Sequence, residues 1–278
     1  MSSSQHPVAY RLEQQVGGAT RLLATVMALP LMDGIFPALL LAGALDTTAG
    51  ILQVGLLVFG GSATVAVVLA EMDDTPREQV TTVLLVGAIV VPVAGLEAAL
   101  APSIERLLDL AVFERFAALV IAAVAAKTAS ARIGEYLPSP AVIIGLGMLA
   151  SLQPAGAELV ILRDAALFDS VLRGVAAAGV GVSFALAVAA FAPHLRGWVE
   201  IDRFRFGSAV ALGVLALSVL GLAPESAPLA VLVVAALLAF DPDGGQDRAV
   251  DATPAVADGG DDESEPGVDE AVGRQPWL

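Results

Sequence analysis

Long apolar runs with few charged residues constrain this chain more than any other feature of its sequence. Most of the runs are 16 to 24 residues long, which is about the length of helix that crosses roughly 30 Å of hydrocarbon at about 1.5 Å per residue. Only 15% of the 278 residues are charged and 57% are hydrophobic, whereas a soluble domain carries about 25% charged residues. The sequence therefore predicts an integral membrane protein.

Eight apolar runs follow one another along the chain. They are rich in Ala, Val, Leu and Gly and lack the polar alternation of barrel strands. The fold class we expect is all-α, a polytopic α-helical membrane protein with about eight transmembrane helices. The fourth run is the least secure because Lys127 must snorkel to an interface if it spans; without it the count is seven. The runs are Leu22–Leu45, Ala49–Ala70, Val80–Leu100, Phe116–Ala131, Leu137–Leu152, Val171–Pro193, Phe206–Leu222 and Pro228–Phe240.

The basic residues predict the orientation of these spans. With eight spans and a cytoplasmic N-terminus, ten of the 14 basic residues fall on the inner side and four on the outer side. Cytoplasmic loops of membrane proteins carry such an excess of Lys and Arg. We therefore expect a multi-pass plasma-membrane protein with the N- and C-termini cytoplasmic.

The chain divides into three segments by composition. Residues 1–19 are polar and lack the apolar core of a signal peptide, so we expect a cytoplasmic N-terminal segment and an uncleaved first span. Residues 20–240 form the predicted transmembrane helical bundle. Residues 241–278 hold 11 acidic residues against Arg248 and Arg274. A segment of this kind buries too little apolar surface to offset its chain entropy, so a disordered acidic cytoplasmic tail is expected.

Asp33 is the candidate functional residue, because it lies near the centre of the first apolar run. An ionised carboxylate in hydrocarbon is costly unless it is paired, hydrated or protonated, so such a residue indicates function. Pro30 and Pro37 remove helical hydrogen bonds and Gly34 removes a side chain, which loosens the helix around the carboxylate. Freed backbone carbonyls and the carboxylate together would suit a proton or a cation.

The alternative is a structural Asp33, either neutral or bonded to a hydroxyl of a neighbouring helix, with prolines that only kink the span. Gln53, Ser62 and Thr64 on the second run are candidate polar partners of Asp33, although uncharged polar residues in spans more often hold helices together. Glu97 is the second carboxylate within a run. It either extends a pathway from Asp33 to the outside or is an interfacial acid in water.

Two further patterns carry structural expectations. Small residues in the run Gly174 to Gly181 recur on adjacent helix turns, which favours close packing of helices. Asp169 and Arg173 are four residues apart, which favours a surface ion pair on a short amphipathic helix that also holds Arg163 and Asp164.

Several classes of function are excluded or disfavoured. The chain has no cysteine and two histidines, so thiolate chemistry and the usual zinc sites are absent. No nucleotide-binding loop, dinucleotide fingerprint, metalloprotease helix or nucleophile elbow is present. The net charge of −15 argues against nucleic-acid binding. We therefore expect neither an enzyme nor a bound cofactor or metal.

The style of the sequence resembles a known group of proteins. Its helices are rich in Ala and Val, its basic residues are 13 Arg and Lys127, and its tail is acidic. In these respects it is similar to uncharacterised multi-spanning membrane proteins of haloarchaea, a family of unknown function. The acidic first helix with Asp33 is faintly similar to that of the LysE-type exporter superfamily. The haloarchaeal resemblance implies a plasma-membrane location and no known activity. The exporter superfamily usually has about six spans, and this chain has no second-half counterpart to Asp33, so Asp33 is the one residue that this similarity carries over.

The leading hypothesis is a secondary transporter or channel for a small solute or ion. Its candidate substrate- or ion-binding residues are Asp33, Gly34, Pro30, Pro37 and Glu97. The alternative is a non-transporting membrane scaffold or subunit that assembles with a partner membrane protein. The expected partners are the lipid bilayer, a small solute or ion, and either further copies of the chain or a partner membrane subunit.

Overall fold

The computed structural model describes residues 18–72, 75–153 and 165–242. Within these ranges the fold is all-helical, with two isolated bridges and no strand. The predicted all-α class is therefore confirmed. Most of the predicted N-terminal segment and acidic tail, together with Arg163 and Asp164, lie outside the described residues.

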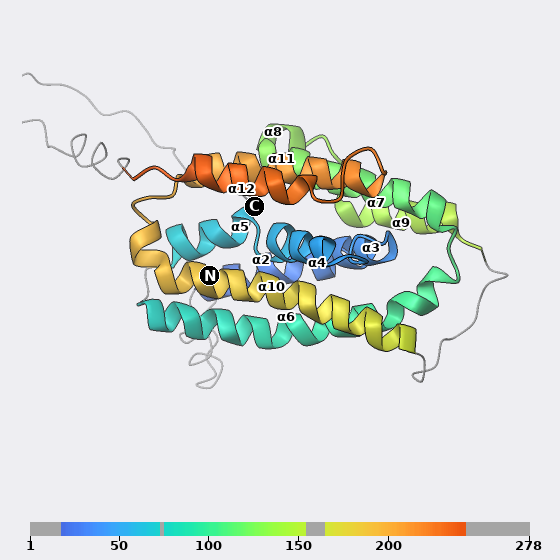
Figure 1. Ribbon diagram of the computed structural model, residues 1–278, viewed down its shortest axis with the longest axis horizontal. Helices are drawn as coiled ribbons and strands as arrows, with labels where there is room; N and C mark the ends of the chain where they lie inside the picture. Colours follow the sequence, from blue (N-terminus) through green and yellow to red (C-terminus); the bar gives the residue numbers. More distant parts are fainter. Residues whose placement is uncertain (1–17, 73–74, 154–164, 243–278) are drawn as a thin grey trace, which may run out of the picture.

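The helices run along the long axis of an elongated bundle (Figure 1). α11 and α12 lie along one side, α6 and α10 along the opposite side, and the helices α2 to α5 lie between them. α7 packs against α11 and against the short α9. The bounds are α2 Gly18–Met32, α3 Ile35–Leu41, α4 Thr48–Val54, η1 Gly55–Phe59, α5 Ser62–Ala66, η2 Val67–Glu71, α6 Pro76–Glu105, α7 Leu110–Ala129, α8 Ala131–Gly134, α9 Pro140–Ser151, α10 Ala165–Leu195, α11 Ile201–Val219 and α12 Ala227–Ala239.

All eight predicted runs are helical, but eight full-length spans were too many by the criteria of length and composition. Among the described residues, three helical segments are long and apolar enough to cross a membrane: Gly18–Leu41, Pro76–Glu105 and Leu167–Leu195. A fourth span is counted if Thr48–Phe59 and Ser62–Glu71, which meet at 46°, form one crossing. α9 and α12 are apolar but have only 12 and 13 residues. α7 and α11 carry charged residues within their helical length.

The first two apolar runs fold as broken helices. α2 ends at Met32 and α3 begins at Ile35. In the second run, the π-helical η1 ends at Phe59 and α5 begins at Ser62, with Gly60 and Gly61 between them. The two runs contact each other next to their breaks, where the rings of Phe36, after the first break, and Phe59, before the second, meet edge to face with centroids 5.2 Å apart.

Unlike the first two runs, α6 and α10 are long continuous helices, and they pack side by side. Small residues make this contact close, as predicted. A Cβ on Gly174 would lie 2.6 Å from the Cβ of Ala98 in α6. Gly181 instead brings α10 close to η1, because a Cβ there would lie 2.3 Å from the Cβ of Phe59. Gly179 does not follow the prediction, because a Cβ there would meet nothing within 4 Å.

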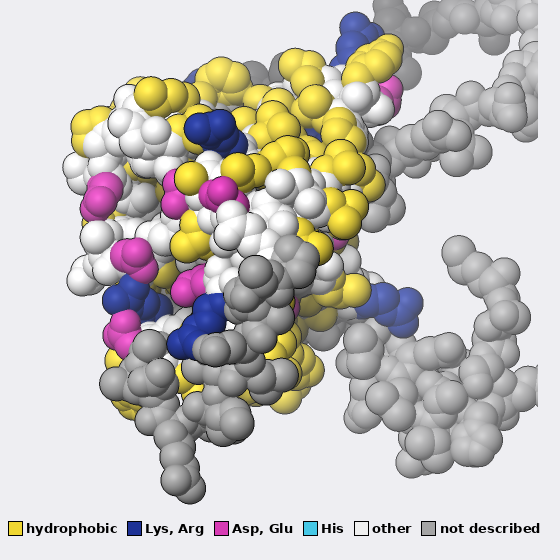
Figure 2. All heavy atoms as spheres, turned by 90° about the vertical axis from the view of Figure 1, so that its right-hand side faces the viewer, with side chains coloured by type: hydrophobic (Ala, Val, Ile, Leu, Met, Phe, Trp, Pro, Cys, Tyr) yellow, Lys and Arg dark blue, Asp and Glu magenta, His cyan; other side chains and the backbone are white. Residues whose placement is uncertain are grey.

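Charged residues gather at the two ends of the bundle. At one end, Arg196 of α10 donates from Nε to the Leu69 carbonyl at 3.1 Å and from Nη2 to the Met72 carbonyl. At the other end, Arg173 pairs with Asp169 at 2.7 Å and with Asp46. Figure 2 looks onto this second end, where acidic and basic side chains lie among polar and apolar ones.

The predicted pair of Asp169 and Arg173 is thus confirmed. Its predicted setting, a separate short helix, is wrong, because both residues lie in the first turns of the 31-residue α10. α10 is apolar beyond these turns, so nothing in its sequence ends the helix between the ion pair and the span.

Candidate functional site

Asp33 lies in the gap between α2 and α3, within the first segment long enough to span a membrane. Its backbone N–H still donates to the Leu29 carbonyl at 2.8 Å, which completes the last turn of α2. The next residue, Gly34, has a φ of 75°. Side chains with a Cβ disfavour this left-handed conformation, so a glycine is what lets the chain turn at this point. The prediction that the helix is loosened around Asp33 is confirmed.

The two prolines act differently around this break. Pro30 is buried inside α2, whereas Pro37 lies in the first turn of α3. The first turn of a helix tolerates proline because its N–H groups have no partner within the helix. Pro37 has no N–H to donate four residues back, so it cannot bond to the carbonyl of Asp33. Asp33 therefore brings both a carboxylate and a backbone carbonyl to the break.

Two other elements face the break. A Cβ on Gly34 would lie 3.3 Å from Cδ1 of Ile144, so α9 packs against the turn. Lys127, near the C-terminal end of α7, interacts electrostatically with Asp33 without forming a direct ion pair. From its sequence position, Lys127 was expected only to snorkel to an interface. A signal was nevertheless present, because Lys127 is the one cation within the fourth apolar run.

The side chain of Asp33 is partly exposed, and the neighbouring Met32 is 81% exposed. The polar residues of the second run do not reach it. Gln53 donates to the Glu225 carbonyl of the turn between α11 and α12, and Thr64 donates to the Phe59 carbonyl at 2.9 Å. Ser62 is buried and forms no bond with Asp33 among the described residues. The alternative in which a neighbouring hydroxyl holds Asp33 therefore finds no partner in this part of the chain.

Glu97 lies within α6, a different helix from the two that flank Asp33. Its Oε2 is buried and has no hydrogen-bond partner among the described residues. No hydrogen bond joins Glu97 to Asp33 within the part of the chain that the structure describes, and the enclosed oxygen of Glu97 differs from that of an acid extended into water.

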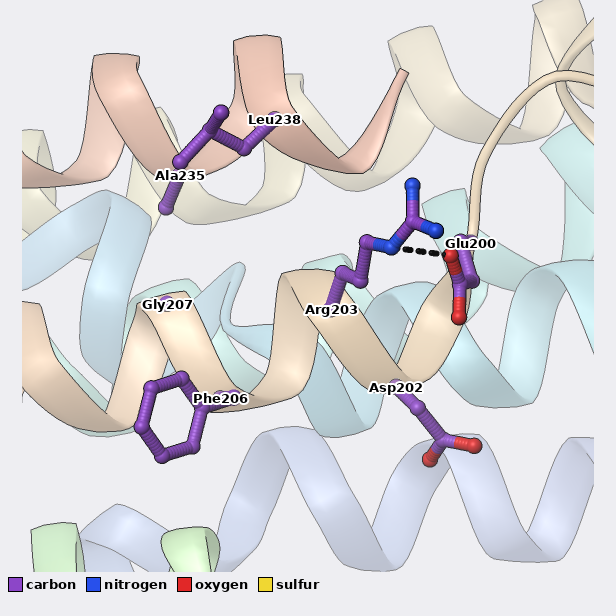
Figure 3. Close-up of a pocket in the computed structure, with 7 residues that line it drawn as sticks. All are labelled: Glu200, Asp202, Arg203, Phe206, Gly207, Ala235 and Leu238. Carbon is purple, nitrogen blue, oxygen red and sulfur yellow. Dashed lines mark ion pairs between the residues drawn. The ribbon is translucent and has the colours of Figure 1, made fainter. Parts of the chain in front are cut away.

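A pocket of about 620 Å³ lies elsewhere, between α11 and α12 near the end that holds Arg196. It is lined by Glu200, Asp202, Arg203, Phe206, Gly207, Ala235 and Leu238 (Figure 3). None of the predicted site residues lines it. Groups of three or more His, Asp or Glu that suit a metal ion are absent from the residues that the structure describes.

Comparison with known proteins gives one similarity. Residues 90–220 match the model of a family of unknown function, DUF5794. The matched part runs from the middle of α6 to just beyond α11, so it includes Glu97 and Lys127 but not Asp33. No curated protein and no solved structure matches the chain. The match supports neither a haloarchaeal origin nor a similarity to LysE-type exporters. What it establishes is that the central helices of this chain are similar to a family whose function is unknown.

Proposed function

We propose that this protein is a secondary transporter or channel for protons or small cations, with Asp33 as the binding group. The observation that carries the proposal is the helix break at residues 33 and 34, within an apolar segment of spanning length. Helix breaks at membrane depth supply carbonyl oxygens for ions while remaining inside the protein. Here the carbonyl and the carboxylate belong to the same residue.

The interaction of Asp33 with Lys127 would differ between the empty and the occupied site. When Asp33 is ionised, the nearby ammonium group offsets its charge in the membrane. A proton or cation that binds the carboxylate removes this attraction and leaves the ammonium group uncompensated. Binding would therefore favour movement of α7 relative to the break, which is the coupling that a transporter requires. Glu97, with one buried oxygen, is a second group that would carry a proton along α6.

The proposal includes a multi-pass arrangement in the plasma membrane. All eight apolar runs are helical and lie along the same axis, so eight crossings with short α9 and α12 agree with the order of the chain. Both termini would then be cytoplasmic. The chain has no cysteine, so single cysteines can report sidedness. We expect Asp46→Cys and Glu225→Cys to react with an impermeant thiol reagent from outside cells, and Glu200→Cys to react only after lysis. Labelling of all three from one side would contradict eight crossings.

Flux measurements test the role of Asp33. Purified full-length protein in liposomes with an internal pH dye would be driven by a potassium diffusion potential, with and without Na⁺. We expect Asp33→Asn to slow the flux about tenfold or more, as loss of one charge-assisted contact implies. Asp202→Asn is the matched control, because that carboxylate is 80% exposed at the start of α11. An unchanged flux in Asp33→Asn would remove Asp33 from the mechanism.

Water access to the break is a separate requirement. We expect Asp33→Cys to react with an impermeant cationic thiol reagent, and Met32→Cys, on the exposed apolar side, to react at least tenfold more slowly, since thiolates do not form in hydrocarbon. An unreactive Asp33→Cys would contradict a water-filled path to the break.

The alternative is a non-transporting scaffold or subunit that assembles with a partner membrane protein or with further copies of itself. Liposomes that contain wild-type protein and conduct H⁺, Na⁺ and K⁺ no faster than empty ones would favour it. In neither case do we propose enzymatic activity, a cofactor or binding of nucleic acid.

A further inference from the structure

The outer face of α11 and α12 combines an apolar groove with a charged end. The two helices touch at Gly207, where a Cβ would lie 2.2 Å from the Cβ of Ala235. This contact forms the floor of the groove. Phe206 and Leu238 line it and are 62% and 67% exposed. Figure 3 shows Arg203 reaching from α11 towards Glu200, while Asp202 points away on the other side of the helix.

The surroundings of the groove indicate that it lies at a membrane surface. Large apolar side chains are exposed along α12, among them Val233, Val234 and Leu237. At the end of the groove, Trp198 and Phe240 meet edge to face with ring centroids 5.5 Å apart. Aromatic and basic residues beside an apolar helical face are typical of the headgroup region. An occupant would therefore place an apolar part along the helices and a polar part beside Glu200 and Arg203.

The charges at the polar end suit a ligand that carries both signs. Arg203 pairs from Nε with Glu200 at 2.5 Å and from Nη1 with Asp241 at 3.6 Å. Neither ion pair uses Nη2. A guanidinium group has five N–H donors and binds phosphate well. Glu200 retains lone pairs on its carboxylate for an ammonium group, because an ionised carboxylate accepts at about four sites.

From these features we propose that the groove binds one phospholipid whose headgroup carries a phosphate and a primary ammonium, as in phosphatidylethanolamine. The phosphate lies against Arg203, the ammonium against Glu200, and an acyl chain runs over Gly207 and Ala235 between Phe206 and Leu238. A volume of about 620 Å³ is within the usual range of roughly 300–1,000 Å³ for ligand sites. An anionic lipid without an ammonium group is disfavoured, because two carboxylates already surround the guanidinium. This inference does not depend on transport or on Asp33.

The test is native mass spectrometry of the full chain released from vesicles with equal parts phosphatidylethanolamine and phosphatidylglycerol. We expect one phosphatidylethanolamine to be retained in preference to phosphatidylglycerol. Glu200→Gln should lower that preference about tenfold, since a charge-assisted contact is lost. Arg203→Gln should lower retention of both lipids, and Arg203→Lys should restore part of it. Equal retention of the two lipids by the wild-type chain would overturn the proposed headgroup.

A second variant tests the groove itself. Leu238→Trp adds bulk at an exposed position, so it should leave the fold intact and abolish retention of either lipid. Glu225→Gln, in the turn at the far end of the same helix pair, is the control and should retain lipid as the wild type does. Retention that Leu238→Trp leaves unchanged would overturn the site, and so would a dimer through this face that excludes lipid.

Discussion

The bundle contains two neighbouring pairs of apolar segments that differ in whether their helices are continuous. α6 and α10 are continuous over 30 and 31 residues, and glycines bring them and their neighbours into close contact. The first two runs are instead interrupted, at Asp33–Gly34 and at Gly60–Gly61. A continuous helix pairs its own backbone N–H and C=O groups in hydrocarbon, whereas a broken helix leaves some of these groups without a partner inside the helix. The broken pair therefore holds Asp33 beside interrupted backbone, whereas the continuous pair packs closely on its neighbours and carries Glu97 within an unbroken helix.

The largest expected effect on stability is at the close contact between the continuous helix α10 and the second broken run. A Cβ at Gly181 would lie 2.3 Å from the Cβ of Phe59 and 2.8 Å from the Gly55 carbonyl oxygen. Because the continuous helix and the broken run cannot both keep their positions, Gly181→Ala should lower the free energy of unfolding by about 3 kcal/mol. Thermal unfolding in detergent measures it. Gly179→Ala is the control, since open space surrounds that position; it should be neutral or slightly stabilising. Equal effects of the two variants would contradict the close packing.

The second largest effect on stability is expected where α10 holds the C-terminal end of the second broken run. Arg196 reaches from α10 to two backbone carbonyls, those of Leu69 and Met72. Arg196→Gln should lower the free energy of unfolding by about 2 kcal/mol, because the carbonyls lose a charged donor. Increased proteolysis after η2 would accompany it. Arg77→Gln, exposed at the start of α6, should change neither measurement. If the two variants behave alike, the continuous helix does not anchor the broken run.

A third prediction concerns the break beside Asp33. Gly34→Ala keeps the charge but places a Cβ at a φ of 75° and 3.3 Å from Ile144. We expect a loss of about 1–2 kcal/mol in unfolding free energy from backbone strain. Gly145→Ala in the adjoining α9 has nothing within 4 Å of its new Cβ and serves as the control. A stabilised Gly34→Ala would mean that the helix is continuous through Asp33.

The smallest effect is expected at the charged end of the continuous pair. Asp169→Asn removes one of the two carboxylates that pair with Arg173. Both groups are partly exposed, so the loss should be at most about 1 kcal/mol and should shrink in high salt. Unfolding at low and high ionic strength measures this. A larger, salt-independent loss would show that the ion pair holds α10 in place.

Particular residues show how far the sequence predicted this arrangement. The eight apolar runs predicted eight helical stretches, because backbone groups in apolar segments must bond within the segment. Pro30, Gly34 and Pro37 predicted the break at Asp33, since their effects on the backbone are local. The break at Gly60 and Gly61 was not predicted. Glycines that let helices pack closely and glycines that interrupt a helix look alike in a sequence.

What the sequence determined by itself is local: helical runs, a broken first span and the i, i+4 pair of Asp169 and Arg173. Only the tertiary structure placed Lys127 near Asp33 and brought Glu200, Arg203 and Leu238 together on one face. The physical reason is that hydrogen bonds and steric limits act between near neighbours in the chain. Which faces of two helices meet depends instead on packing between residues far apart in the sequence.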